Sequence, residues 1–316
     1  MPPKTITVIG SLNTDLVTVT RRLPHPGETL TSKSFSTVPG GKGANQAVAA
    51  CRLSRGSAGA PSDITVKMVG AVGADGFGSV LKATLERDGV DVEGVAVRED
   101  IGTGVAVIIV DEDTAENRIL VNPGANGKVT HDLFSQNYFT SPSAPTSLLL
   151  MQLEIPLQTV LHLLSLADDA SIPTIFNPAP AIPIPINYYP KMTHLIVNET
   201  EAAMLTGEEV EGLDVDAAAS VLLGRGVKGS VVITLGAKGG YFRTSDGEGG
   251  WLNPEVIEAK DVVDTTGAGD TFVGAFAVAI VEGKGARAAA EWAGKAAGRK
   301  VRKRGAQEGI PWRGEL

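Results

Sequence analysis

Residues 194–234 read HLIVNETEAAMLTGEEVEGLDVDAAASVLLGRGVKGSVVIT and carry the clearest signal of fold class in the chain. The short apolar runs His194–Val197 and Val231–Thr234 have the length and the branched side chains of buried strands. Between them, we predict helices at Glu199–Leu205 and Val215–Gly224. Strands separated by helices pair in parallel through right-handed crossovers, so this stretch predicts an α/β fold.

The same alternation extends towards the N-terminus. We predict strands at Thr5–Gly10, Ser147–Met151 and Thr174–Asn177, and a helix at about Leu157–Asp168. The chain of 316 residues is long enough for one large α/β domain. We therefore expect a single domain over residues 1–316, with a three-layer α/β/α core around a mainly parallel sheet.

A smaller set of strands interrupts this pattern. Leu16–Phe35 contains short alternating segments broken by prolines and a glycine, and further strands are predicted at Val95–Val97, Gly104–Val110 and Arg118–Val121. We expect these segments, at about residues 16–36 and 95–122, to form a β-sheet lid beside the core.

Polar residues follow several of the predicted core strands. Glu154, Asn177, Asn198 and Thr234 each stand at or just after the end of a strand. The carboxyl ends of parallel strands share one edge of a sheet, which is where open α/β sheets bind ligands. The accumulation of these residues predicts a ligand cleft at that edge.

The loop 263–272, VDTTGAGDTF, precedes the apolar run Val273–Val281 and is predicted to open a buried helix. The first N–H groups of a helix lack intrahelical partners and attract negative charge. Gly267, Ala268 and Gly269 are therefore candidates for an anion hole, and Asp270 beside them is a candidate base for phosphoryl transfer. A helix start with an ordinary Asp in its first turn is the alternative.

Two further stretches contain candidate binding residues. Asn13 and Asp15 point to the same side of an extended chain, where they could bind adjacent sugar hydroxyls, although Asn and Asp are also common turn residues. The glycine-rich stretch 39–46 leads into a helix predicted at Ala47–Leu53 and places Lys42 and Asn45 near any ligand. A tight turn that caps a helix explains this stretch equally well.

Composition excludes several other classes of protein. A formal net charge of −8 argues against a nucleic-acid binder, and we expect no such partner. Cys51 is the only cysteine and lies in an apolar stretch that we predict to be core. No apolar run approaches the ~20 residues of a membrane span, and no signal peptide is visible. We expect a cytoplasmic protein without membrane partners; an additional nuclear location stays open.

Eight stretches are taken together for comparison with known families: Gly10–Asp15, Gly40–Gln46 (GGKGANQ), Met151–Glu154, Asn177–Pro180, Asn198–Glu201, Thr234–Gly236, Asp264–Asp270 and Gly305–Gln307. In these stretches the chain resembles the ribokinase family of sugar kinases, which includes fructokinases and adenosine kinase, nearly from end to end. The early Asn/Asp pair and the Met-Gln-Leu-Glu block resemble the ribokinase branch most.

The resemblance implies ATP-dependent phosphorylation of D-ribose at its 5-hydroxyl group, giving ribose 5-phosphate and ADP. It implies that Asp270 is the base and that the amides of Gly267, Ala268 and Gly269 form the anion hole. The residues that it assigns to the sugar are Asn13, Asp15, Gly41, Lys42, Asn45 and Glu154. It also implies a homodimer built through the lid.

The resemblance further implies sites for the nucleotide and for two metal ions. Thr234, Gly236 and Gly269 would lie along ATP, and Asn198 and Glu201 would organise Mg²⁺ and phosphates largely through water. An activating K⁺ ion would bind the Asp264 carboxylate, the Thr266 carbonyl and carbonyls of the tail near Lys300, Lys303 and Gly305.

Two positions depart from the family pattern. Gly309 stands where the family often has a hydroxyl-bearing cation ligand, and Gly294 stands where it often has Asn or His near the adenine. Another sugar or nucleoside kinase of the same family is the first alternative function. The second is a non-catalytic sensor on the same fold, although such a protein would usually have lost Asp270 or the loop glycines.

Overall fold

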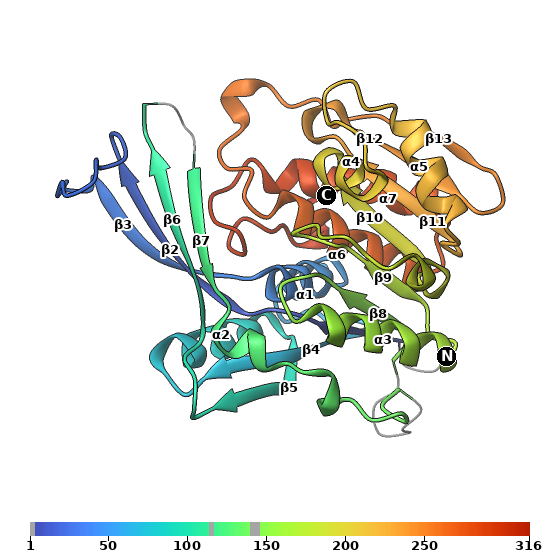
Figure 1. Cartoon of the computed structure of the whole chain (residues 1–316), viewed down its shortest axis with the longest axis horizontal. Coiled ribbons are helices and arrows are strands. Elements are labelled where there is room, and N and C mark those ends of the chain that lie inside the picture. The colour runs from blue at the N-terminus through green and yellow to red at the C-terminus, as the bar shows by residue number, and fades with distance from the viewer. Residues whose placement is uncertain (1–3, 114–116, 140–145) are drawn as a thin grey trace.

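The computed structural model describes residues 4–113, 117–139 and 146–316. Its strands form a nine-stranded sheet and a four-stranded sheet. In Figure 1 the smaller sheet projects from one side of the body, which contains the larger sheet and the helices. This arrangement confirms the predicted α/β class with a smaller sheet beside the core.

The larger sheet is parallel except at one edge, where β12 and β13 form an antiparallel hairpin next to β11. Its strands are, in spatial order, β13 (Gly249–Leu252), β12 (Gly240–Thr244), β11 (Ser230–Thr234), β10 (His194–Asn198), β9 (Thr174–Phe176), β8 (Leu148–Met151), β1 (Lys4–Ile9), β4 (Ile64–Gly73) and β5 (Asp91–Arg98). From β1 the chain continues to β4 on one side, whereas β8 lies on the other side, so the strand order reverses at β1. Ligands usually bind at such a point of an α/β sheet.

Helices cover both faces of this sheet. The helices on one face are α1 (Lys42–Leu53), α2 (Gly76–Asp88), α6 (Ala268–Val281) and α7 (Ala286–Lys300). Those on the other face are α3 (Leu157–Asp169), α4 (Glu199–Thr206) and α5 (Val215–Gly224). Short 3₁₀ turns lie at Gly124–Lys128, His131–Leu133, Ile186–Lys191, Gly236–Lys238, Ala259–Asp261 and Arg313–Glu315. None of the helices in the described ranges combines the length and the apolar character that crossing a membrane requires.

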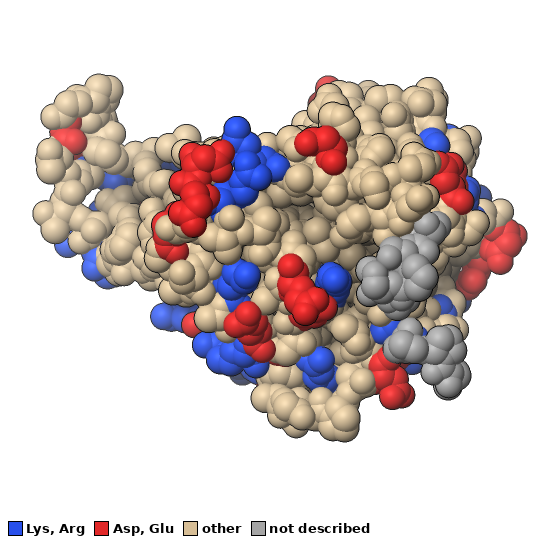
Figure 2. Space-filling view, turned by 90° about the horizontal axis from the view of Figure 1, so that it is seen from below, with Lys and Arg blue, Asp and Glu red and all other residues tan. Residues whose placement is uncertain are grey.

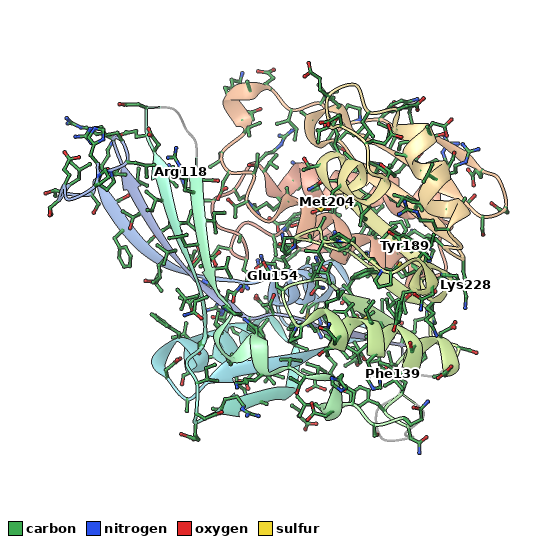
Figure 3. All side chains as sticks on the ribbon, viewed as in Figure 1. Arg118, Phe139, Glu154, Tyr189, Met204 and Lys228 are labelled. Carbon is green, nitrogen blue, oxygen red and sulfur yellow. The ribbon has the colours of Figure 1, made fainter. Side chains whose placement is uncertain are left out.

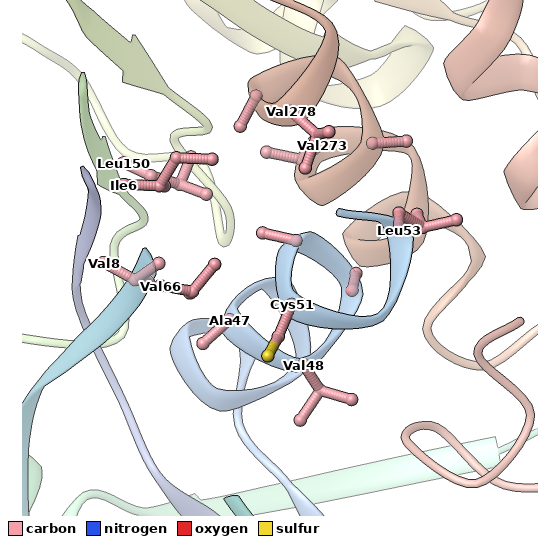
Figure 4. Close-up of a cluster of buried hydrophobic side chains, with 14 of the residues drawn as sticks. Ile6, Val8, Ala47, Val48, Cys51, Leu53, Val66, Leu150, Val273 and Val278 are labelled. Carbon is pink, nitrogen blue, oxygen red and sulfur yellow. The ribbon is translucent and has the colours of Figure 1, made fainter. Parts of the chain in front are cut away.

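The core divides into two clusters because successive side chains of a strand point to opposite faces. In β8, Leu148 and Leu150 pack with the first group of helices, whereas Leu149 and Met151 pack with the second. Figure 4 shows the first cluster, where strand residues face α1 and α6. Cys51 lies in this cluster and is fully buried, which confirms its prediction as core.

The smaller sheet has the order β3-β2-β6-β7, with bounds Ser34–Gly40, Asn13–Thr20, Gly104–Asp111 and Asn117–Asn122. The prediction that residues from 95 belong to it is wrong in part. Residues 95–98 lie in β5, which pairs in parallel with β4 at the edge of the larger sheet. By its sequence, this short segment with mixed exposure could belong to either sheet. Its pairing with β4 is what assigns it to the larger sheet. The prediction of a single domain stays a prediction.

The start of one helix also differs from the prediction. α1 begins at Lys42, not at Ala47, because Gly41 adopts a φ of 88° and turns the chain directly into the helix. A Cβ atom at Gly41 would lie 2.6 Å from the amide nitrogen of Asn13, so only glycine fits there. α2 begins at Gly76, because the Asp75 carboxylate accepts a hydrogen bond from the Gly78 N–H and caps the helix there.

Charged residues of both signs are mixed on one face of the molecule. On the face drawn in Figure 2, the described lysine and arginine side chains are interspersed with aspartate and glutamate side chains. That face therefore presents no extended basic patch of described residues to a nucleic acid.

Candidate active site

The parallel strands bring the predicted polar residues to one edge of the larger sheet. Glu154 follows β8, Asn177 follows β9, Asn198 ends β10 and Thr234 ends β11, and these strands are consecutive neighbours. This is the edge that the strand pattern predicts as a cleft. α1 and α6 begin at the same edge and supply the remaining groups.

Asp270 is held by two amide side chains of α1. Nδ2 of Asn45 donates to Oδ2 of Asp270 at 2.9 Å, and Nε2 of Gln46 donates to Oδ1 at 2.9 Å. Only 9% of Asp270 is exposed, and Gln46 is fully buried. Because each carboxylate oxygen has a donor, the carboxylate is fixed in one orientation while lone pairs remain to accept a proton.

Further amides fix these two donors. Gln46 also donates to Oδ1 of Asn177 at 3.0 Å and accepts a hydrogen bond of 2.6 Å from Gln152. Gln307, near the C-terminus, donates to Oδ1 of Asn45 at 3.1 Å. Three buried side chains from distant parts of the chain thus position the pair that holds Asp270.

The helix start at α6 offers backbone donors. In the described part of the chain, no acceptor lies opposite the N–H groups of Gly267, Gly269 or Asp270. The N–H group of Ala268 instead donates to the carbonyl of Thr265 at 3.1 Å. This amide is therefore not a free donor, whereas the predicted anion hole includes it. The turn that places Gly267 in the left-handed region, with φ of 77°, draws the Ala268 amide back towards Thr265.

A pocket joins this helix start to the strand ends. Its walls include Lys42, Asn198, Glu201, Thr234 and Asp270, together with Gly267 and Gly269. Burial lowers the pKa of Lys42, but the carboxylates of Asp270, Glu154, Glu201 and Asp15 outweigh it and raise the pKa above its ordinary value. Lys42 is therefore a cation surrounded by carboxylates on both sides.

Asn198 and Glu201 form a capping box at the start of α4. The Glu201 carboxylate accepts from the Asn198 N–H at 2.9 Å, and the Asn198 side chain accepts from the Glu201 N–H at 2.8 Å. Burial raises the pKa of Glu201, and the Asn198 N–H and Lys42 oppose that rise. Gly236 lies just beyond the end of β11, at the turn Gly236–Lys238.

The predicted sugar residues surround the start of α1. Oε2 of Glu154 accepts from the Ser11 hydroxyl at 2.5 Å and from the Lys42 N–H at 2.9 Å. Figure 3 shows Glu154 near the centre of the molecule, where the smaller sheet meets the body. Asn13 is held by Asn126, whose Nδ2 donates to Oδ1 of Asn13 at 2.8 Å.

Asp15 has the largest upward pKa shift of a carboxyl group in this site. Burial, together with the charges of Glu154 and Asp270, raises its pKa from 3.8 to about 7, although the charge of Lys42 opposes the rise. The carboxyl group thus lies in an enclosed, acidic environment beside the end of the smaller sheet.

The residues predicted to bind a monovalent cation also lie together. The Asp264 carboxylate accepts from the N–H groups of Thr266 and Gly305, at 2.9 and 2.8 Å. The side chain of Lys300 reaches the same group and donates to the carbonyls of Asp264 and Lys303, at 2.9 and 3.3 Å. Among the described residues, no cluster of three or more His, Cys, Asp or Glu side chains could hold a metal ion.

Sequence reasoning missed several residues of the site, namely Ser11, Gln46, Asn126, Gln152 and Gln307. Each is a polar side chain that is fully or almost fully buried, and each makes a hydrogen bond to a predicted residue or to its support. All but Asn126 lie inside or beside the stretches quoted for the family resemblance. Asn126 has no such signal, because it comes from a separate turn.

Known proteins resemble the chain over nearly its whole length. Residues 3–313 match the model of the pfkB family of carbohydrate kinases. A ribokinase of Schizosaccharomyces pombe is 43% identical over 311 residues, which cover 97% of this chain and 94% of that protein. The structure of Arabidopsis thaliana ribokinase complexed with ribose and ATP has a TM-score of 0.84 and 32% identity, covering 99% and 97% of the chains. That of Thermotoga maritima ribokinase has a TM-score of 0.83 and 34% identity, with the same coverage.

Proposed function

The chain belongs to the pfkB family of carbohydrate kinases, and on this premise we propose that it transfers the γ-phosphoryl group of ATP to the 5-hydroxyl group of D-ribose. Membership confirms the predicted family and the prediction of an enzyme of ribokinase type. The proposal of ribose as the sugar is supported by the ribokinases among its relatives and by the Asn13, Asp15 and Glu154 group described above.

Asp270 acts as the base in the proposed reaction. Asn45 and Gln46 hold its carboxylate, which accepts the proton of the 5-hydroxyl group as that oxygen attacks the γ-phosphorus. The bond from the γ-phosphorus to the bridging oxygen breaks, and ADP leaves. Positioning of this kind supplies much of the rate of phosphoryl transfer, because the transition state is loose.

Charge on the transferring group is stabilised by the α6 start and by Lys42. The N–H groups of Gly267, Gly269 and Asp270 have no acceptor among the described residues, and they meet Lys42 in the same pocket. Asn198 and Glu201 line that pocket as well, and Glu201 has a partly buried carboxylate suited to hold Mg²⁺ through water. A bound Mg²⁺ ion would neutralise phosphate charge there.

Sugar recognition is assigned to the other side of Lys42 and Asp270. Asn13, Asp15, Lys42, Asn45 and Glu154 offer both donors and acceptors, as a polyhydroxyl ligand requires. Thr234 and Gly236 follow β11 and are assigned to the nucleotide. Lys42 and Asp270 belong to both groups, so the acceptor and the phosphate donor meet at these two residues.

The observation that carries the proposal is the position of Asp270, which stands among free helix N–H groups and also bonds to a predicted sugar ligand, Asn45. The test is ADP release from ATP and Mg²⁺ with ribose, deoxyribose, fructose or adenosine, followed by NMR location of the phosphate. Turnover with ribose and a phosphate on C5 is expected. Turnover only with another sugar would support the proposed kinase activity and exclude ribose as its substrate. Ribose binding without any turnover would support the sensor alternative.

We also propose a homodimer formed through the smaller sheet. Ile119, Leu120 and Val121 of its edge strand β7 are all exposed, with 68% of Leu120 accessible to solvent. An exposed edge strand with apolar side chains is a surface that proteins usually cover. Light scattering of the wild-type protein and of Leu120→Lys tests this, with Val256→Lys as the control at another exposed apolar position. A monomeric wild-type protein would reject the dimer.

A cytoplasmic location remains part of the proposal. It is supported by the single cysteine, which is buried and unpaired. Imaging of the tagged full chain in its own cell would test the location, and export from the cell would contradict it.

A further inference from the structure

Lys300 is the last residue of α7, and its side chain is fully buried. The ammonium group points towards the loop that precedes α6. It donates to the carbonyl of Asp264 at 2.9 Å and to the carbonyl of Lys303 at 3.3 Å, and it lies 4.0 Å from the Asp264 carboxylate. A positive group of this chain thus lies among the atoms predicted to bind K⁺.

All of the remaining predicted ligands except the Thr266 carbonyl already accept a hydrogen bond from the described residues. Both oxygens of the Asp264 carboxylate accept backbone N–H groups, as described above. The carbonyl of Lys300 accepts from the Lys303 N–H at 3.0 Å, and the carbonyl of Gly305 accepts from the Gly309 N–H at 3.1 Å. These oxygens keep a lone pair each, but the Lys300 ammonium lies among them, bonded to the carbonyls of Asp264 and Lys303. A potassium ion would have to displace this ammonium group, so the residues present do not fit the ion.

Gly309 packs tightly against backbone carbonyls of the same region. A Cβ atom there would lie 2.9 Å from the carbonyl oxygen of Gly305 and 3.0 Å from those of Arg304 and Lys303. A hydroxyl-bearing side chain therefore does not fit unless the tail opens. The tail thus lacks a side-chain ligand at Gly309 and has a lysine ammonium instead.

Two hydrogen bonds and a nearby carboxylate hold the Lys300 ammonium in this cluster. A buried ammonium is costly unless it is paired and hydrogen-bonded, and here it has two carbonyls and a carboxylate.

The C-terminal segment that contains this cluster directly contacts the loop before α6, which leads to the proposed base Asp270. The N–H groups of Val263 and Asp264 donate to the carbonyl of Val301, at 2.8 and 3.1 Å. At the other end of the loop, Gly267 packs so closely on Ala306 that a Cβ atom would lie 2.8 Å from its carbonyl oxygen. The loop is thus fixed by the tail at both ends, and Asp270 follows three residues after Gly267.

We propose that the Lys300 ammonium is a built-in cation that replaces the predicted K⁺ ion and positions the Asp264–Gly267 loop, so that phosphoryl transfer does not depend on a monovalent metal ion. This inference rests on the proposed kinase function. Lys300 is a positioning residue, because it contacts the loop and not the reacting atoms. It also replaces the expectation of K⁺ activation drawn from the family resemblance.

The first test compares the wild-type protein in potassium, sodium and tetramethylammonium salts at equal ionic strength. Turnover with ribose is expected to be the same in all three salts. The melting temperature, measured without substrates, is also expected to be unchanged when potassium replaces tetramethylammonium, because the Lys300 ammonium fills the predicted cation site. Stimulation of turnover or a rise in melting temperature that is specific to potassium would overturn the proposal.

The second test uses Lys300→Ala, which removes the ammonium and leaves its space. In tetramethylammonium, turnover is expected to fall about tenfold or more, as for loss of a charge-assisted hydrogen bond. Potassium or ammonium ions should restore part of that loss and raise the melting temperature of this variant only. Lys295→Ala, at an exposed position of the same helix, is the control and should resemble the wild type.

The outcomes separate the two proposals. If no sugar is phosphorylated in any salt, the proposed function fails, and the melting temperatures still test the cation. If Lys300→Ala does not fold, the wild-type salt comparison decides. A folded Lys300→Ala variant that turns over like the wild type in tetramethylammonium would show that the ammonium does not position the loop.

Discussion

Gln46 and Asp270 lie 224 positions apart in the chain and meet through a hydrogen bond of 2.9 Å from Nε2 to Oδ1. The bond joins the N-terminal part of α1 to the first turn of α6. Gln46 is fully buried and Asp270 is only 9% exposed, so Gln46 offers no surface to a substrate. The orientation of the proposed base therefore depends on a residue that does not touch the sugar.

Gln46→Ala should lower kcat for ribose by about tenfold to a hundredfold, because a buried hydrogen bond to a charged acceptor is lost. The KM for ribose should change little, since Asn13, Asp15 and Glu154 stay in place. Steady-state kinetics measures both values, and Gln136→Ala, an exposed position, is the control. A higher KM with an unchanged kcat would indicate that Gln46 shapes the sugar site instead.

Asp270→Asn should lower kcat by about a hundredfold to ten-thousandfold, the usual contribution of a general base. The amide keeps the shape of the side chain, so ribose should still bind in calorimetry. Asp63→Asn, at an exposed position, controls for the change of charge. Retained turnover in Asp270→Asn would exclude this residue as the base.

The affinity for ribose should rise with pH up to about pH 7, because the pKa of Asp15 in the free protein is raised to about 7. If ribose hydroxyls donate to Asp15, binding favours the carboxylate and releases a proton below that pH. The dissociation constant should then fall by about tenfold per pH unit and level off above pH 7.

Calorimetry in two buffers of different ionisation enthalpy would detect the released proton. Asp15→Asn cannot ionise, so its weaker affinity should lack the pH dependence. A wild-type affinity that is flat across this range would show that Asp15 does not accept hydrogen bonds from the sugar as a carboxylate.

Arg52→Met should destabilise the protein by about 3–5 kcal/mol, because it leaves the carboxylate of Asp88 buried without its partner. Arg52 bonds to both oxygens of Asp88, at 3.0 and 2.8 Å, and donates to the carbonyls of Gln307 and Ile310. Urea unfolding measures the change, and Arg87→Met on the exposed face of α2 is the control. Equal stability of the two variants would contradict the argument.

Local patterns predicted most of the core. α5 has the predicted bounds, and β10 and β11 differ from them by one residue each, because buried strands and helices in this stretch each have their own periodicity. The hairpin of β12 and β13 was not predicted. It is a short edge pair with glycines at several positions, and its pairing with β11 is a contact that no local pattern contains.

The candidate site divides in the same way. Asn13, Lys42, Asn45, Glu154 and Asp270 are predictable, since polar residues at strand ends and helix starts depend on short stretches of sequence. Asn126, which holds Asn13, comes from a separate turn with no motif of its own. Its role exists only because folding brings it against the residues between β1 and β2.

Neighbouring residues specify strands, helices and glycine turns, so the α/β class, the family, the helix start at Gly267–Asp270 and most groups of the site could be predicted from local sequence. Three features depend on packing between distant segments: the amides that hold Asp270, the sheet that contains residues 95–98, and the group that lies at the predicted cation site. Lys300 shows the reason most clearly: its ammonium lies against Asp264, 36 positions away, and such a contact depends on how helices and loops pack. In the sequence alone, Lys300 is one lysine in a basic tail.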